Sequence, residues 1–116
     1  MATNSNWTVV FEDKKITKQK GDAAGTAYKI SDDAFWSQPK FSNIWAIQYG
    51  ATVPTDEVEY RDTTPHSTFS SANLGDFNDF INKWDSAHLS QLQSDWDADP
   101  RVESEKGPRP TSYSSL

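Results

Sequence analysis

Residues 77–96 read FNDFINKWDSAHLSQLQSDW, a run in which large apolar side chains recur every three or four positions. The members of this stripe are Phe77, Phe80, Ile81, Trp84 and Leu92, with Leu89 and Trp96 at its margin. Such spacing places them on one side of an α-helix. Asn73 is a suitable N-cap, and Pro100 ends the pattern because it lacks a backbone donor. The sequence therefore predicts one long helix over residues 73–97, with an aromatic face to bury.

Five stretches upstream of this helix have the patterns of β-strands. Residues 7–11, 26–30 and 57–61 alternate apolar and polar side chains with a period of two, as half-buried strands do. Residues 15–19 continue the pattern in a β-compatible way. Residues 41–49 are apolar on both faces, which predicts a strand that is covered on both sides in the middle of the sheet.

The order of these elements, strands first and one long helix last, predicts an α+β fold. We expect a mostly antiparallel, four- to five-stranded sheet packed against the long C-terminal helix, in a single domain over residues 1–99. Residues 100–116 are rich in proline and serine and form an extended C-terminal tail that has little to bury. We expect this tail to dock on a neighbouring chain, and the alternative is that the protein's own core holds it.

Composition narrows the classes of function. The chain has 116 residues, a net charge of −6 and no cysteine. The acidic balance argues against nucleic-acid binding, and the missing thiols exclude disulfides and cysteine-ligated zinc. The longest apolar run is residues 44–47, so we expect neither a signal peptide nor a membrane span. No phosphate-binding glycine loop occurs, and no cofactor is predicted.

The two histidines have different surroundings. His88 lies within the apolar stripe of the helix, which predicts a structural, hydrogen-bonded imidazole. His66 follows Thr64-Pro65 in a polar connection and could reach Asp62, giving a carboxylate–imidazole pair that orients a base or a metal ligand. Asp62 and His66 are thus a candidate polar site, although a plain surface histidine is the favoured interpretation.

Clusters of acids are a weaker signal, since solvated surfaces carry many of them. Asp56, Glu57 and Glu59 precede or share a strand, and further aspartates alternate over residues 95–99. Neither cluster has the glycine and closing glutamate of a calcium loop. We therefore assign no catalytic and no metal-binding residues from the sequence.

Two surfaces are candidates for interaction. The first is a basic patch of Lys14, Lys15, Lys18 and Lys20, which protects a sheet edge or meets an acidic partner. The second is the polar face of the strand over residues 57–61, together with exposed aromatic anchors. Its candidate residues are Trp7, Trp36, Glu57, Glu59, Tyr60, Arg61 and Tyr113. The alternative is that all the aromatic residues except Tyr113 belong to the core.

The run SNIWAIQYG over residues 42–50, with DEVEYRD at 56–62 and TPH at 64–66, resembles small proteins of tailed marine viruses, especially cyanobacterial myoviruses. The closing segment, with GPRPTSY at 107–113, adds to this resemblance. It covers most of the chain and implies no activity, cofactor or site residue. It implies a location, namely the cytoplasm of the infected bacterial host or the virion.

These observations favour a non-catalytic small viral protein that acts through protein–protein contact and self-associates, in a structural or assembly role. The protein partner is then most simply another copy of the chain. One alternative is a regulator that binds a host protein. A less favoured alternative is a metal-dependent hydrolase centred on Asp62 and His66.

Overall fold

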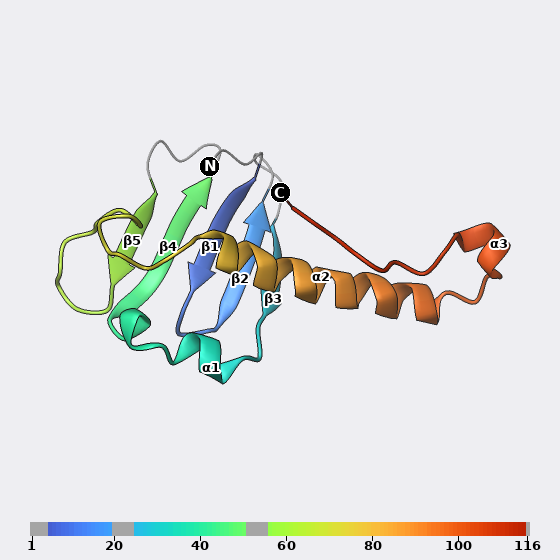
Figure 1. Cartoon of the computed structure of the whole chain (residues 1–116), viewed down its shortest axis with the longest axis horizontal. Coiled ribbons are helices and arrows are strands. Elements are labelled where there is room, and N and C mark those ends of the chain that lie inside the picture. Colours follow the sequence, from blue (N-terminus) through green and yellow to red (C-terminus); the bar gives the residue numbers. More distant parts are fainter. Residues whose placement is uncertain (1–4, 20–24, 51–55, 116) are drawn as a thin grey trace.

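The computed structural model describes residues 5–19, 25–50 and 56–115. Its strands are β1 (Asn6–Val10), β2 (Lys15–Gln19), β3 (Thr26–Lys29), β4 (Ile44–Gly50) and β5 (Glu57–Tyr60). Its helices are α1 (Asp33–Trp36), the 3-10 turn η1 (Pro39–Phe41), α2 (Asn78–Ala98) and α3 (Glu103–Lys106). The strands form one antiparallel sheet, and α2 runs across one face of it (Figure 1). The predicted α+β fold is confirmed.

The strand order is β3-β2-β1-β4-β5, so β1 occupies the centre of the sheet. The prediction that residues 41–49 form the middle strand is wrong, since β4 lies one place away from the centre. A bulge between Ile44 and Ala46 explains the misleading pattern, because it inserts Trp45 as an extra residue. Trp45 is 45% exposed, so the second apolar face of this strand is not fully covered.

The inner face of the sheet and the apolar stripe of α2 form the core. One row of paired residues crosses the sheet as Ile16, Val9, Ile47 and Val58, and all four are fully buried. From the helix, Phe80, Ile81 and Trp84 pack on this face, and the ring of Trp84 meets that of Trp7 edge-on at 5.7 Å between centroids. The stripe predicted from the sequence is therefore the contact between the two layers.

Aromatic rings supply much of the core area. The ring of Phe80 lies within 6.2 Å of five other phenylalanine rings, measured between centroids. These rings belong to Phe11, Phe35, Phe41, Phe69 and Phe77. Each large ring removes far more apolar area from water than a small aliphatic side chain does. This cluster explains how a chain with few aliphatic residues forms a core.

The start of α2 differs from the prediction. The helix begins at Asn78, not Asn73, because the backbone at Asn73 and Gly75 has φ values of 57° and 97°. Both values lie in the left-handed region, which a right-handed helix cannot include. Asp76 takes over the capping role, since its Oδ1 accepts a hydrogen bond from the Asn78 amide at 2.9 Å.

The helix is longer than the sheet is wide. Its 21 residues extend roughly 32 Å, while five strands span roughly 19 Å between the outermost ones. The C-terminal half of α2 consequently projects beyond β3 and forms, with α3 and the returning chain, an arm over residues 90–110 (Figure 1). The radius of gyration of 16.2 Å exceeds the ~13 Å of a compact chain of this length.

Candidate functional site

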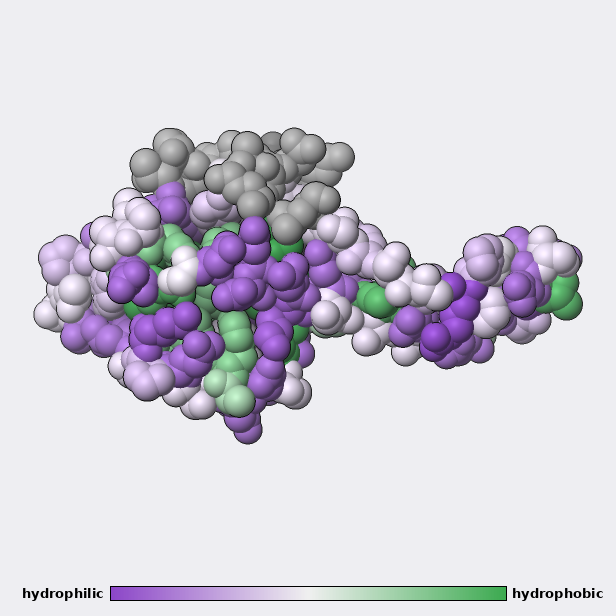
Figure 2. All heavy atoms as spheres, viewed as in Figure 1, coloured by the Kyte–Doolittle hydropathy of each residue, from purple (hydrophilic) through white to green (hydrophobic). Residues whose placement is uncertain are grey.

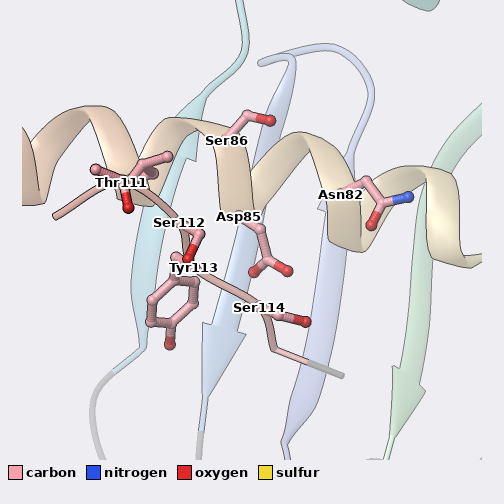
Figure 3. Close-up of a pocket in the computed structure, with 8 residues that line it drawn as sticks. Asn82, Asp85, Ser86, Thr111, Ser112, Tyr113 and Ser114 are labelled. Atoms are coloured by element: carbon pink, nitrogen blue, oxygen red, sulfur yellow. The ribbon is translucent and has the colours of Figure 1, made fainter.

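The C-terminal tail returns along α2 and docks on the chain's own domain. Tyr113 packs edge-on against the His88 ring, with 4.4 Å between centroids, and lies 6.0 Å from the Trp84 ring. Figure 3 shows the tail residues 111–114 lying alongside Asp85 and its neighbours on the helix. Docking on a neighbouring chain remains a prediction, but within one chain the tail has a binding place of its own.

Asp85 fixes the end of this tail. Asp85 is only 7% exposed and directly follows the core residue Trp84 in the helix. Oδ2 accepts the backbone N–H of Ser115 at 2.8 Å, and Oδ1 accepts the Ser115 hydroxyl at 2.5 Å. A buried carboxylate needs such donors, because losing its water without them is costly.

Lys18 of β2 joins the sheet to the same tail. Its Nζ donates to the Tyr113 hydroxyl at 3.2 Å and to Ser115 Oγ at 3.1 Å. The ammonium also lies 5.0 Å from the centroid of the Trp84 ring, within the range of a cation–π attraction. We call Lys18, Trp84, Asp85, His88 and Tyr113 the tail clasp.

His88 has the structural surroundings predicted for it. Its ring stacks on Trp84 at 4.7 Å between centroids, and Nδ1 shares a 2.8 Å hydrogen bond with the hydroxyl of Tyr28. Burial lowers the pKa of His88 below 6.5, and the nearby Lys18 lowers it further. The clasp therefore favours a neutral imidazole.

The acids at the end of the helix serve the arm. Asp97 binds the guanidinium of Arg109 at 3.0 Å, and Asp99 binds Arg101 through both of its carboxylate oxygens. The hydrogen bonds from Arg101 lower the pKa of Asp99 to about 2. Lys106 donates to the backbone carbonyl of Asp99 at 2.9 Å. These contacts join the end of α2 to the segment that follows it at the tip of the arm, and they leave both carboxylates in ion pairs within the chain.

The other face of the sheet carries no helix in the described residues. One row of register partners crosses all five strands as Lys29, Lys15, Val10, Ala46 and Glu59. Charge thus changes along this row from basic on β3 and β2, through small apolar residues, to acidic on β5. Figure 2 shows the opposite, helix-bearing face, where hydrophilic and neutral residues cover most of α2.

A second row runs parallel to the first on this outer face. It consists of Ala27, Thr17, Thr8, Gln48 and Glu57. The acidic end lies again on β5, beside the bulged strand that carries Trp45. Taken together, the two rows give the outer face short or β-branched side chains in the centre, lysines at one edge and glutamates at the other.

A carboxylate–imidazole cluster lies at the acidic edge. An antiparallel bridge pairs Val58 with Ser67 through backbone hydrogen bonds of 2.6 and 3.2 Å. It brings His66 beside β5, where His66 Nδ1 lies 2.5 Å from Glu57 Oε1. Glu59 completes the group, since one ligand atom from each of the three side chains lies within 4.8 Å of the others.

Asp62, the partner predicted for His66, is engaged elsewhere. Its carboxylate accepts hydrogen bonds from the backbone N–H of Thr64 at 2.9 Å and from the Asn43 side chain at 3.0 Å. These bonds, above all those with Thr64, lower the pKa of Asp62. The imidazole pairs with a carboxylate, the less favoured of the two interpretations of His66, and that carboxylate is Glu57 on the strand instead of Asp62 in the loop.

The predicted aromatic anchors are buried, in the case of the two tryptophans, or half-buried, in the case of the two tyrosines. Trp7 and Trp36 are 1% and 8% exposed, and both belong to the core cluster. Tyr60 is half-buried, and its hydroxyl lies 2.5 Å from Ser67 Oγ. Tyr113 is held in the tail clasp, whereas Arg61 is exposed beside β5. Trp7 and Trp36 follow the alternative, in which aromatic residues other than Tyr113 are core.

The predicted basic patch is divided among three surroundings. Lys14 pairs with Asp33 of α1 at 2.8 Å, Lys15 lies on the outer face, and Lys18 enters the tail clasp. Lys20 lies outside the described residues. Alternation along β2 sends successive lysines to opposite faces, which explains why the cluster in sequence is not one in space.

Comparison with protein-family models, curated proteins and solved structures finds no match to this chain. Among the residues that the structure describes, no helix combines the length and the apolar composition that crossing a membrane requires. Sequence reasoning overlooked Asp85 and the grouping of Glu57 with His66. The first had a signal, since Asp85 lies four residues after Ile81 and three before His88, within the stripe that the helix buries, where a carboxylate requires partners.

Proposed function

We propose that this protein is a non-catalytic interaction module that self-associates, two copies meeting through the outer face of the sheet. The observation that carries this proposal is the charge gradient along the row from Lys29 and Lys15 to Glu59. In a twofold dimer the second copy presents the same row in the opposite direction, so the basic end of each copy meets the acidic end of the other.

The geometry follows from the register. A rotation by 180° about an axis parallel to the strands, between two stacked sheets, lays β5 of one copy over β2 and β3 of the other. Glu59 then faces Lys15 and Lys29 of the second copy, at two equivalent places. Val10 and Ala46 lie at the centre of the row, where small side chains let two sheets approach at roughly 10 Å.

The area of the outer sheet face sets the affinity that we expect for the dimer. Two rows across five strands cover roughly 24 Å by 14 Å, which is less than the ~800 Å² that each partner buries in a standard interface, so the contact belongs to the weak, transient class. The two edges of this face are polar, as the rims of non-obligate interfaces are. We therefore expect a reversible dimer that grows with protein concentration.

The biological setting of the proposal comes from the resemblance to small proteins of tailed marine viruses. In that setting the module acts in the infected bacterial cell or in the virion. A regulator that binds a host protein is the other arrangement this face permits, and the experiment below separates the two.

The test is sedimentation velocity over a concentration series of the tag-free full chain. We expect the wild type to dimerise, while K15E/K29E and E59K each remain monomeric because like charges then meet. Mixing these two variants restores both charge pairs and should give a heterodimer. Glu105→Lys, which changes charge equally on α3, is the control and should dimerise like the wild type.

Two outcomes overturn the proposal. The first is a wild-type chain that stays monomeric at every concentration, which directs attention to a different partner. The second is a dimer that resists K15E/K29E and E59K, which places the contact on another surface such as the arm.

A further inference from the structure

We propose that Glu57, Glu59 and His66 form a binding site for one divalent transition-metal ion of the Zn²⁺ class. The site lies at the acidic edge of the outer sheet face. Its three ligands come from one strand and from the segment bridged to it, and none of them belongs to the tail clasp or to the core.

Backbone structure brings the three side chains together. Glu57 and Glu59 are two residues apart in β5, so both point to the outer face, while Val58 between them points inward and is fully buried. The bridge from Val58 to Ser67 places His66 opposite this pair by the same alternation. Strand register thus fixes the two glutamates, and the backbone bridge at Ser67 brings the loop that carries His66 beside them.

The distances suit coordination after small side-chain rotations. Zinc binds nitrogen and carboxylate oxygen ligands at about 2.0–2.2 Å, and a tetrahedral arrangement then separates neighbouring ligand atoms by roughly 3.3–3.6 Å. In the structure the three ligand atoms lie within 4.8 Å of one another, and His66 Nδ1 is 2.5 Å from Glu57 Oε1. Half-buried glutamates and an exposed histidine can rotate their side chains this far without disturbing the strand.

The local charge favours a cation. Among the described residues, no lysine or arginine forms an ion pair with Glu57 or Glu59. Glu57 is paired with His66, and Glu59 accepts a 3.4 Å hydrogen bond from Gln48. Two carboxylates on one edge without a basic partner repel each other, and a bound dication removes that repulsion.

The chemistry of the ligands selects the class of ion. An imidazole nitrogen with two carboxylates suits Zn²⁺ and its neighbours, whereas Ca²⁺ and Mg²⁺ prefer oxygen ligands alone. Three protein ligands leave a coordination position for water. A shallow cavity of about 250 Å³, lined by Asp56, Ser67 and Thr68 as well as two of the ligands, provides the space for it.

The test is isothermal titration of ZnCl₂ into the tag-free full chain. We expect one ion per chain, and little competition from excess Mg²⁺. Losing an outer partner of a metal ligand already weakens binding 10–100-fold, so Glu57→Gln and His66→Asn should each weaken it at least about tenfold. Glu105→Gln removes an acid from α3 and should leave the affinity unchanged.

A second measurement guards against misfolded variants. Bound Co²⁺ in place of Zn²⁺ gives a visible spectrum whose intensity reports the coordination number, and the wild-type spectrum should be lost in His66→Asn while its circular dichroism stays native. Zinc affinity that is equal in the wild type, Glu57→Gln and His66→Asn overturns the site, and so does a wild type that binds no zinc.

The metal site does not rest on the proposed self-association. Titrating K15E/K29E separates the two, since this variant keeps all three ligands but loses the proposed contact between copies. Zinc binding that is retained or tightened is expected in that variant, because Glu59 no longer faces the lysines of a second copy. Loss of zinc binding there, with the ligands intact, contradicts a site contained within one chain.

Discussion

Tyr113, near the end of the chain, packs edge-on against His88 in the middle of α2, with 4.4 Å between the ring centroids. The contact joins a proline- and serine-rich tail to the apolar stripe of the helix. Lys18 reaches the same tyrosine from β2, so three segments distant in sequence meet at one point. The tail is consequently part of the domain, although its composition alone predicts an unfolded segment.

Removing the tyrosine ring should loosen the tail and lower stability. For Tyr113→Ala we expect a free energy of unfolding about 1–3 kcal/mol lower, below the loss for a fully buried aromatic because Tyr113 is half-buried. Urea denaturation measures this change. Val102→Ala is the control, since Val102 is 62% exposed and its loss should change the stability by less than about 0.5 kcal/mol. Equal stability of both variants contradicts the docking of the tail.

The hydrogen bonds of Asp85 should be energetically coupled to Ser115. Replacing Ser115 by alanine removes the hydroxyl that donates to Asp85 Oδ1, and Asp85→Asn weakens the same bond from the other side. A double-mutant cycle on unfolding free energies should give a coupling of about 0.5–3 kcal/mol. Strict additivity of the two substitutions shows that the bond contributes nothing to stability.

Stability should depend on pH through His88. Burial and the charge of Lys18 lower its pKa in the folded state, against smaller opposing effects of Asp85 and Asp95. The unfolded chain therefore binds the proton more readily, so stability is fully present above pH 6.5 and falls as the pH drops through the interval below it. Tyr28 also faces the ring and stays protonated throughout this interval, because its own pKa is raised.

Thermal unfolding measured between roughly pH 5 and 7 tests this dependence. His88→Phe keeps the stacking on Trp84 but cannot be protonated, so its melting temperature should vary less with pH than that of the wild type. His66→Asn, which removes the other histidine, should retain the slope. If the pH dependence of the melting temperature is lost in His66→Asn and kept in His88→Phe, then His66 causes it and the prediction for His88 is wrong.

Gly50 should tolerate no side chain. Its φ is +138°, and a Cβ there would collide with the backbone of Ser5 and lie 2.7 Å from Asn6 Cα. We expect Gly50→Ala to cost about 2–4 kcal/mol from strain and collision together. Gly107→Ala is the matched control, because its φ of +80° and ψ of −175° strain an alanine while no atom beyond its chain neighbours lies within 4 Å, so strain alone should cost about 1–3 kcal/mol, less than at Gly50. Equal losses contradict the close approach at Gly50.

The arm tip should show one strongly acidic carboxyl group. The hydrogen bonds from Arg101 hold the pKa of Asp99 at about 2, against a usual value of 3.8. A carbon-detected NMR titration of the wild type and of Arg101→Gln measures both states. The substitution should move the Asp99 pKa upward toward its usual value, and an unchanged pKa shows that the ion pair does not persist in solution.

The elements with regular periodicity were predictable. The stripe from Phe77 to Trp84 identified the face of α2 that meets the sheet, because burying large rings contributes more to the free energy of folding than helix propensity or capping does. The alternation of residues 57–61 likewise identified β5 and its wet face. A period of two is sufficient to place Glu57 and Glu59 together on one polar surface.

Other features depended on backbone conformations that residue types allow but do not impose. Asn73 can cap a helix or adopt a left-handed turn, and the chain uses the turn, which moves the helix start to Asn78. Trp45 reads as a core residue, yet the bulge in β4 exposes it. In both cases the local sequence allows either backbone conformation at a similar free energy, so tertiary packing decides which one forms.

The sequence by itself determined the α+β class, the antiparallel sheet and the buried face of the long helix, because each follows from a local repeat of apolar side chains. Tertiary structure alone decided that His66 meets Glu57 instead of Asp62, and that Tyr113 returns to His88. Such contacts join residues whose separation along the chain carries no periodic signal. They arise only when strand register and the length of α2 have fixed where each segment lies.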